Sequence, residues 1–207
     1  MSSTDRDKWN ARYLAGAYAD REHPSLLVAK QLPDIVSTQR AASGVDAELR
    51  ALDLACGAGR NALYLAGFGY RVDAVDISAE ALARGETRAR KQGLTVSWVE
   101  HDLDLGLPRS LGAYDLIVII RYFDLSLVAA AAERLQPGGY LICEAHLATQ
   151  EAVIGPRDPS FRAKPGELHA ATGALDTVKY WEGLTLDPDG RVAALARLVA
   201  WKPLDRR

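Results

Sequence analysis

The residues best suited to chemistry lie in the stretch Asp53-Leu54-Ala55-Cys56-Gly57-Ala58-Gly59 and at Asp76. Gly57 and Gly59 lack side chains, so a ligand can approach the backbone there, and a helix that follows them offers free N–H groups and a positive dipole end. Asp76 ends the next predicted strand, where a carboxylate can accept both hydrogen bonds of a ribose diol. This arrangement predicts a site for an adenosine-containing cofactor.

The glycine turn alone leaves the choice of cofactor open. Gly57-x-Gly59-x-x-Ala62 also fits the dinucleotide fingerprint, so an NAD(P)-dependent oxidoreductase is one alternative and a tight turn without a ligand is another. Asp76 could equally supply negative charge to the N-terminus of the helix after it. Two further acids favour a different cofactor. Asp53 is costly inside an apolar strand unless it meets backbone donors or a cationic ligand, and Asp102 follows a later strand within reach of an adenine amino group.

The elements that position these residues alternate as strand and helix from about residue 50 to 146, the pattern of a parallel sheet with helices on both faces. Five strands are predicted at 51–55, 71–76, 95–101, 114–120 and 140–145, with helices at 61–68, 78–92 and 126–135 and a turn at Pro137-Gly138-Gly139. Two more strands, 176–186 and 192–201, flank the hairpin turn Asp187-Pro188-Asp189-Gly190. The predicted fold class is α/β, with one doubly wound, Rossmann-like sheet of seven mostly parallel strands and a C-terminal antiparallel hairpin.

The composition places these elements in one domain. The chain has 207 residues, 48% of them hydrophobic, and shows no linker or repeat, so we expect a single unit over 1–207. Within it, 1–45 is expected to be a helical cap, 46–146 the cofactor-binding core, and 147–207 an acceptor-side loop and hairpin. The interspersed charges, with a formal net charge of -2, argue against a nucleic-acid surface.

The same features predict a cytoplasmic protein. Cys56 and Cys143 lie in apolar strands without a disulfide spacing, and neither a membrane span nor an apolar signal core is visible. No metal site is expected, because the histidines have no zinc-binding spacing. The oligomeric state is not indicated by the sequence.

Together, these residues resemble the class I S-adenosylmethionine-dependent methyltransferases. The resemblance runs through five ordered motifs: 52–59, Asp76, Asp102, 114–118 and 135–139. A finer similarity to the small bacterial tellurite-resistance (TehB-like) methyltransferases is carried by Trp9-Asn10-x-Arg12-Tyr13, by 59–66 and by Pro165-Gly166-Glu167-Leu168. Ala55 replaces the first glycine of the family turn. The loop 147–163 and the stretch Tyr122-Phe123-Asp124 match least, which leaves tellurite doubtful as the acceptor.

The resemblance implies S-adenosylmethionine as cofactor, S-adenosylhomocysteine as product, and in-line methyl transfer to a small-molecule acceptor. The implied cofactor-binding residues are Asp53, Ala55, Cys56, Gly57, Gly59, Asn61, Asp76, Ile77, Asp102, Leu103, Ile119 and Arg121. A non-catalytic protein that binds the same cofactor remains an alternative, because methyl transfer requires no diagnostic catalytic residue and a general base is optional.

Three residues just past the ends of predicted strands are candidates for the catalytic site: Arg121, Tyr122 and His146. Arg121 would suit an anionic acceptor but could be a solvated charge, and His146 could simply cap its strand. The N-terminal helices, with Arg12 and Tyr13, could close over the cofactor as a lid or contribute ordinary packing.

Overall fold

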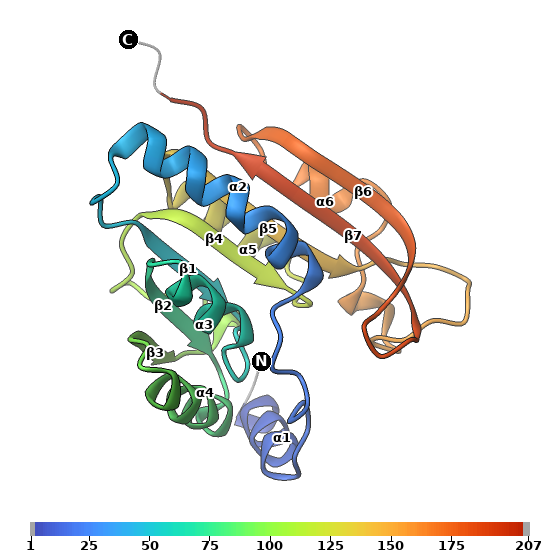
Figure 1. Cartoon of the computed structure of the whole chain (residues 1–207). Coiled ribbons are helices and arrows are strands. Elements are labelled where there is room, and N and C mark those ends of the chain that lie inside the picture. Colours follow the sequence, from blue (N-terminus) through green and yellow to red (C-terminus); the bar gives the residue numbers. More distant parts are fainter. Residues whose placement is uncertain (1–2, 205–207) are drawn as a thin grey trace.

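The computed structural model describes residues 3–204, and a seven-stranded sheet of order β3-β2-β1-β4-β5-β7-β6 forms its centre (Figure 1). The strands are β1 (Arg50–Leu54), β2 (Arg71–Asp76), β3 (Val96–Glu100), β4 (Tyr114–Ile120), β5 (Leu135–His146), β6 (Asp176–Leu186) and β7 (Val192–Trp201). The first five run parallel, and β7 pairs antiparallel with both β5 and β6. The predicted α/β fold, with its terminal hairpin, is confirmed. The first two and last three residues of the expected 1–207 unit lie outside the described residues.

Helices cover both faces of this sheet (Figure 1). They are α1 (Ser3–Leu14), α2 (Leu26–Ser43), α3 (Arg60–Gly67), α4 (Ala79–Gln92), α5 (Leu125–Glu133) and α6 (Glu167–Ala170), with 3-10 turns η1 (Leu103–Leu105) and η2 (Pro159–Phe161). Side chains of α2, α3 and α4 form one apolar cluster with the sheet, and side chains of α5 and α6 form a second. The apolar strands are therefore buried on both faces, as expected for parallel strands crossed over by helices.

The strand register brings the candidate residues to one edge of the sheet. Leu54, near the end of β1, pairs with Val75 of β2 and with Ile119 of β4, and Ile120 pairs with Glu144 of β5. The segments that follow these strands consequently emerge side by side. We call the side of the sheet at which the parallel strands end the carboxyl edge.

Two local predictions need correction. The helix predicted at 126–135 ends at Glu133, and Pro137-Gly138-Gly139 lies within β5 rather than in a separate turn. These residues form an irregularity in the ladder, because the pairing passes from Tyr114↔Leu135 directly to Leu116↔Tyr140. Backbone bonds between Gly138, Gly139 and Lys202 hold the irregularity against the chain that follows β7. Long-range pairing thus overrides the local turn signal.

The N-terminal region is also less continuously helical than the helical cap predicted at 1–45. Helix α1 ends at Leu14, and α2 begins only after Ser25, whose side chain accepts a hydrogen bond from the Val28 N–H. The intervening segment follows a non-helical path past the carboxyl edge. We call residues 10–25, which comprise the end of α1 and this segment, the strap.

Candidate active site

Asp53 of β1 is a hydrogen-bond acceptor for the first turn of α3. Its side chain is 1% exposed, and its Oδ2 accepts a hydrogen bond of 2.9 Å from the Ala62 N–H. Burial raises the pKa of Asp53 to about 7, while the Ala62 N–H and the charge of Arg60 oppose the rise. Asp53 therefore has a hydrogen-bond donor within the protein. A cationic ligand nearby would favour the ionised form of Asp53.

The glycine turn has a strained backbone at its first position. Ala55 has φ 54°, in the left-handed region that costs a residue with a side chain about 1 kcal/mol. Gly57 and Gly59 have φ 56° and 73°, and a Cβ on them would collide with the Tyr13 hydroxyl and the Trp98 ring, respectively. Gly59 has no side chain to cap α3, and Asp53 accepts from the Ala62 N–H. The N–H groups of Arg60 and Asn61 are therefore the ones at the start of the helix that a ligand could bind.

Asp76 ties the end of β2 to this turn. Its Oδ2 accepts from the Gly57 N–H at 2.7 Å, and its Oδ1 accepts from the Ser78 N–H at 2.9 Å. Burial raises the pKa of Asp76, and the N–H donors of Ser78, Gly57 and Ile77 act against that rise. Each carboxylate oxygen can accept more than one hydrogen bond, so both retain capacity for a diol.

The remaining predicted cofactor residues surround this centre. Asp102 ends the segment after β3 and caps η1, and Leu103 beside it is buried in the core. Ile77 and Cys56 are buried next to Asp76 and the turn, and burial raises the pKa of the Cys56 thiol.

Asn61 and Ile119 interact mainly with other parts of the protein. The Oδ1 of Asn61 accepts a hydrogen bond from the Ser25 N–H at 2.9 Å, which fastens the end of the strap to α3. Ile119 belongs to the apolar core, so its side chain serves packing beneath the carboxyl edge.

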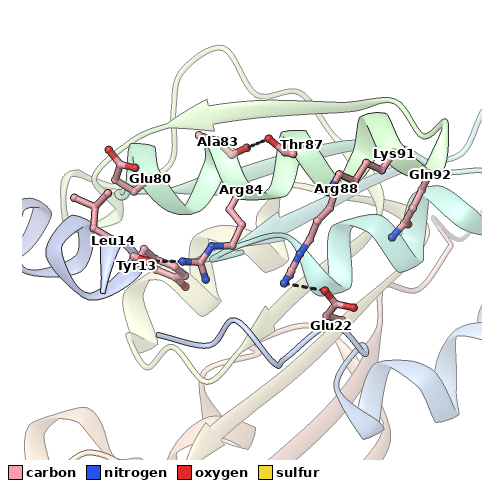
Figure 2. Close-up of a pocket in the computed structure, with 10 residues that line it drawn as sticks. All are labelled: Tyr13, Leu14, Glu22, Glu80, Ala83, Arg84, Thr87, Arg88, Lys91 and Gln92. Atoms are coloured by element: carbon pink, nitrogen blue, oxygen red, sulfur yellow. Dashed lines mark hydrogen bonds and ion pairs between the residues drawn. The ribbon is translucent and has the colours of Figure 1, made fainter. Parts of the chain in front are cut away.

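The strap is fastened to α4, and Figure 2 shows two of these contacts, from Arg84 to Tyr13 and from Arg88 to Glu22. The Ser78 hydroxyl donates to Asn10 at 2.8 Å, and the guanidinium of Arg84 donates to the carbonyls of Tyr13 and, at 2.8 Å, Ala17. Arg88 donates to the Ala19 carbonyl and pairs with Glu22 at 3.3 Å. These bonds fix the backbone path of the strap beside the glycine turn.

Tyr13 is the strap residue that meets the turn. It is 8% exposed, its hydroxyl lies against Gly57, and burial followed by the charge of Asp76 raises its pKa, so the hydroxyl stays protonated. Arg12, by contrast, is exposed and stacks on Trp9. The motif around Trp9 pointed to this segment, but Tyr13 was not among the predicted cofactor residues.

Arg121 lies in a buried ionic cluster after β4. Its Nε bonds Glu144 Oε1 at 2.5 Å and its Nη2 bonds Asp187 Oδ1 at 2.5 Å, while Arg197 Nε bonds Glu144 Oε2 at 2.7 Å. Burial lowers the pKa of Arg121, but Glu144 and Asp187 more than compensate and raise it overall. Glu144 is 2% exposed. Glu144 was not among the predicted site residues, although an acid inside the apolar strand 140–145 is the same kind of signal that drew attention to Asp53.

His146 ends β5 beside this cluster. It is 9% exposed, and its Nδ1 is enclosed without a hydrogen-bond partner among residues 3–204, packed against Gly155. Burial lowers the pKa of His146 to about 4, and the positive charges of Arg121 and Arg162 act in the same direction. The imidazole is therefore neutral at physiological pH.

The predicted residues thus fall into two groups along the carboxyl edge. Asp53, the glycine turn and Asp76 lie together at β1 and β2, and Arg121 and His146 lie together at β4 and β5. The side chain of Tyr122 does not join Arg121 and His146, because its hydroxyl donates a hydrogen bond to Asp104 in η1 at 3.0 Å.

A surface hollow of about 640 Å³ lies outside the carboxyl edge. It runs between the strap and α4 and is lined by Arg84, Arg88 and Lys91 among others (Figure 2). Within the described residues, no group of three or more His, Cys, Asp or Glu side chains is placed to hold a metal ion.

Comparison with known proteins identifies the family. A model described as a methyltransferase domain matches residues 51–139. A ubiquinone biosynthesis O-methyltransferase of Burkholderia ambifaria is 30% identical over 168 residues, which cover 71% of this chain and 72% of that enzyme. The chain belongs to the S-adenosylmethionine-dependent methyltransferases. The choice that the glycine turn left open is thereby decided: the cofactor of this methyltransferase is S-adenosylmethionine, and its reaction is methyl transfer to a small molecule.

Solved structures agree with this assignment. TehB from Haemophilus influenzae superimposes with a TM-score of 0.66 at 27% identity, and the match covers 82% of the methyltransferase described here but 62% of the TehB chain. Magnesium protoporphyrin IX methyltransferase (ChlM) from Synechocystis PCC 6803, with SAH bound, shares the fold at a TM-score of 0.68 and 14% identity over 97% of this chain and 98% of that one. No helix in residues 3–204 of this methyltransferase is long and apolar enough to cross a membrane.

Proposed function

We propose that the carboxyl edge holds S-adenosylmethionine over β1 and β2 and receives the methyl acceptor over β4 and β5. The observation that carries this proposal is the position of Asp76, which bonds the glycine turn at 2.7 Å and keeps free lone pairs beside it. The open N–H groups at the start of α3 suit the methionyl carboxylate, and Asp53 suits the methionyl ammonium. The residues present therefore fit the cofactor.

We assign roles to the cofactor residues accordingly. Asp76 receives the ribose hydroxyls, Ile77 packs on the adenine, and Asp102 with Leu103 borders its edge. The turn from Ala55 to Gly59, including Cys56 and Gly57, lines the methionyl end through its backbone, and Asn61 positions the strap. Ile119 and Arg121 lie beneath the reacting centre, and Tyr13 covers it. When bound, the cofactor supplies a sulfonium methyl group for in-line transfer, and these residues align it and exclude water.

For the acceptor we propose an oxygen atom of a small hydroxylated molecule, because the curated relatives are named O-methyltransferases. We propose His146 as a hydrogen-bond donor to this acceptor. An N–H enclosed at Nδ1 without a partner would be costly, so the proton of the neutral imidazole belongs on Nε2. Arg121 then acts by orienting groups. No general base is assigned, so the acceptor hydroxyl releases its proton to solvent and the oxygen takes the methyl group as S-adenosylhomocysteine leaves as a neutral thioether.

Calorimetry and turnover together test this function. We expect S-adenosylhomocysteine to bind and NAD not to bind. Labelled S-adenosylmethionine should transfer its methyl group within a panel of hydroxylated aromatics, thiols, amines and tellurite, with oxygen acceptors preferred. Cofactor binding without transfer to any acceptor would indicate a binding protein, and preferred methylation of a thiol or amine would exclude the oxygen acceptor.

The raised pKa of Asp53 predicts that cofactor affinity depends on pH. The ionised carboxylate is the form that attracts the methionyl ammonium, so affinity for S-adenosylhomocysteine should rise about tenfold between pH 5.5 and 7. Titrations across this range with the wild type and Asp53→Asn measure the effect, and the variant should bind weakly with little pH dependence. An equal pH dependence in both proteins would remove Asp53 from the ammonium site.

The absence of nucleic-acid and membrane partners and a cytoplasmic location remain predictions from the composition and the cysteines. A nuclease-treated sample that retains no nucleic acid, together with fractionation of cells, would test them.

A further inference from the structure

Strand β6 is the last strand of the sheet, and its outer side has no partner in the part of the chain that the structure describes. Only β7 pairs with it there (Figure 1). The strand has eleven residues, and seven of them are exposed. Its N–H and C=O groups that point away from β7 are therefore available to another strand. We call this outer side the β6 edge.

The opposite end of the sheet is protected against such pairing. Strand β3 has only five residues, and none of its large hydrophobic side chains is exposed. Its last residue, Glu100, is charged and forms an ion pair with Arg6 of α1 at 3.4 Å. A short strand with a charged side chain is a common protection of a sheet edge, and β6 is not short.

The β6 edge also carries exposed hydrophobic side chains. Those on β6 are Val178 (50% exposed), Trp181 (42%), Leu184 (51%) and Leu186 (63%). Val192 of β7, which pairs with Leu186, is 39% exposed as well. Apolar side chains grouped on one long, unpaired strand mark a surface at which another chain can bind.

The two charged side chains in the middle of β6 are bound within the protein itself. The Lys179 ammonium donates a hydrogen bond to Gln31 of α2 at 2.7 Å. Glu182 accepts from the Gly166 N–H at 2.9 Å and from the Tyr180 hydroxyl. Because α2 and the start of α6 cover opposite faces of the sheet, each charge is held over a face and does not protect the edge.

We infer that the β6 edges of two copies of this chain pair antiparallel, so that one sheet continues through a dimer. A two-fold axis perpendicular to the sheet brings the same strand of each copy together in opposite directions, which makes the contact self-complementary. The formal net charge of -2 gives little repulsion between the copies.

The charges of β6 favour a pairing centred on Trp181. This register places Tyr180 opposite the partner's Glu182. It also places Lys179 opposite the partner's Gly183, so that no two like charges face each other. A pairing centred one residue later would place the two Glu182 carboxylates opposite each other.

The dimer is independent of the proposed function. Strands β4, β5 and β7 separate β6 from β1 and β2, where the proposed cofactor residues lie. Pairing at the β6 edge therefore leaves the cofactor site open, and a failure of either proposal would not decide the other.

Sedimentation velocity of the full chain between about 1 and about 100 µM tests the inference with two variants, Val178→Lys and Leu184→Lys. The matched control is Val45→Lys, which places the same charge on an exposed valine between α2 and β1. We expect the wild type to be mostly dimeric at about 50 µM, and each β6 variant to raise the dissociation constant at least about tenfold. Val45→Lys should leave it unchanged.

Amide hydrogen exchange of the wild type adds a test that needs no substitution. As the protein concentration rises through the same range, the amides of β6 that point away from β7 should exchange at least about threefold more slowly. The amides of β3 are the internal control, and their exchange should not depend on concentration.

Three results would overturn the inference. The first is a wild type that stays monomeric up to the highest concentration, even if another protein binds its β6 edge. The second is a dimer that keeps its stability in both β6 variants. The third is a dimer whose β6 amides exchange as fast as those of the monomer, because a different surface would then join the two copies.

Discussion

Replacing Glu144 with glutamine is expected to lower the free energy of unfolding by about 3 kcal/mol. The substitution keeps the shape of the side chain but leaves Arg121 and Arg197 without the carboxylate that both contact, at 2.5 and 2.7 Å. Because Glu144 is 2% exposed, water cannot replace the lost charge easily. Urea denaturation of the wild type and Glu144→Gln, followed by far-UV circular dichroism, gives the difference directly.

Asp189→Asn is the matched control for Glu144→Gln, because it also removes a carboxylate charge shared by two arginines, Arg191 and Arg21, but at an exposed position. Its effect should stay below about 1 kcal/mol, the usual range for surface ion pairs. The double variant Glu144→Gln/Arg197→Gln should recover part of the stability lost in Glu144→Gln, since Arg121 keeps its ion pair with Asp187 and Arg197 is the guanidinium left without a carboxylate. A Glu144→Gln protein as stable as the wild type would show that the cluster is already solvated.

Replacing Asp76 with alanine is expected to weaken S-adenosylhomocysteine binding at least about tenfold, through loss of charge-assisted hydrogen bonds. The same change also deprives the Gly57 and Ser78 N–H groups of their acceptor, so part of the loss comes from a less ordered turn. Asp76→Asn separates these effects, because its amide oxygen can still serve one N–H group without the charge. Affinities from calorimetry should rank wild type, then Asp76→Asn, then Asp76→Ala.

Asp34→Ala, on the exposed side of α2, controls for a general loss of negative charge and should bind normally. Thermal unfolding of each variant shows whether the protein is folded under the conditions of the titration. Near-normal affinity in folded Asp76→Ala would remove Asp76 from the cofactor site.

The local sequence was sufficient to predict the fold, which the structure confirms, and to name the residues of the proposed cofactor site at β1 and β2. Alternating apolar runs and the glycine turn predicted the parallel strands, and the helix predicted at 78–92 agrees with α4, which Ser78 and Gly93 cap. These signals succeed because strand periodicity, capping and glycine conformations depend on neighbouring residues in the chain. The turn from Asp53 to Gly59, and Asp76 at the end of the next strand, were predicted from local signals of this kind.

The state of the charged groups was decided only by the tertiary structure. The sequence named Arg121 as a candidate for the acceptor site, yet its partners Glu144 and Asp187 come from β5 and the β6–β7 turn, far along the chain. The same holds for the fastening of the strap by Arg84. Burial and pairing depend on distances in space between residues distant in sequence, and no local pattern encodes those distances. The sequence by itself therefore determined the fold and predicted a site for an adenosine-containing cofactor, and the tertiary structure decided how the charged groups beside that site are paired.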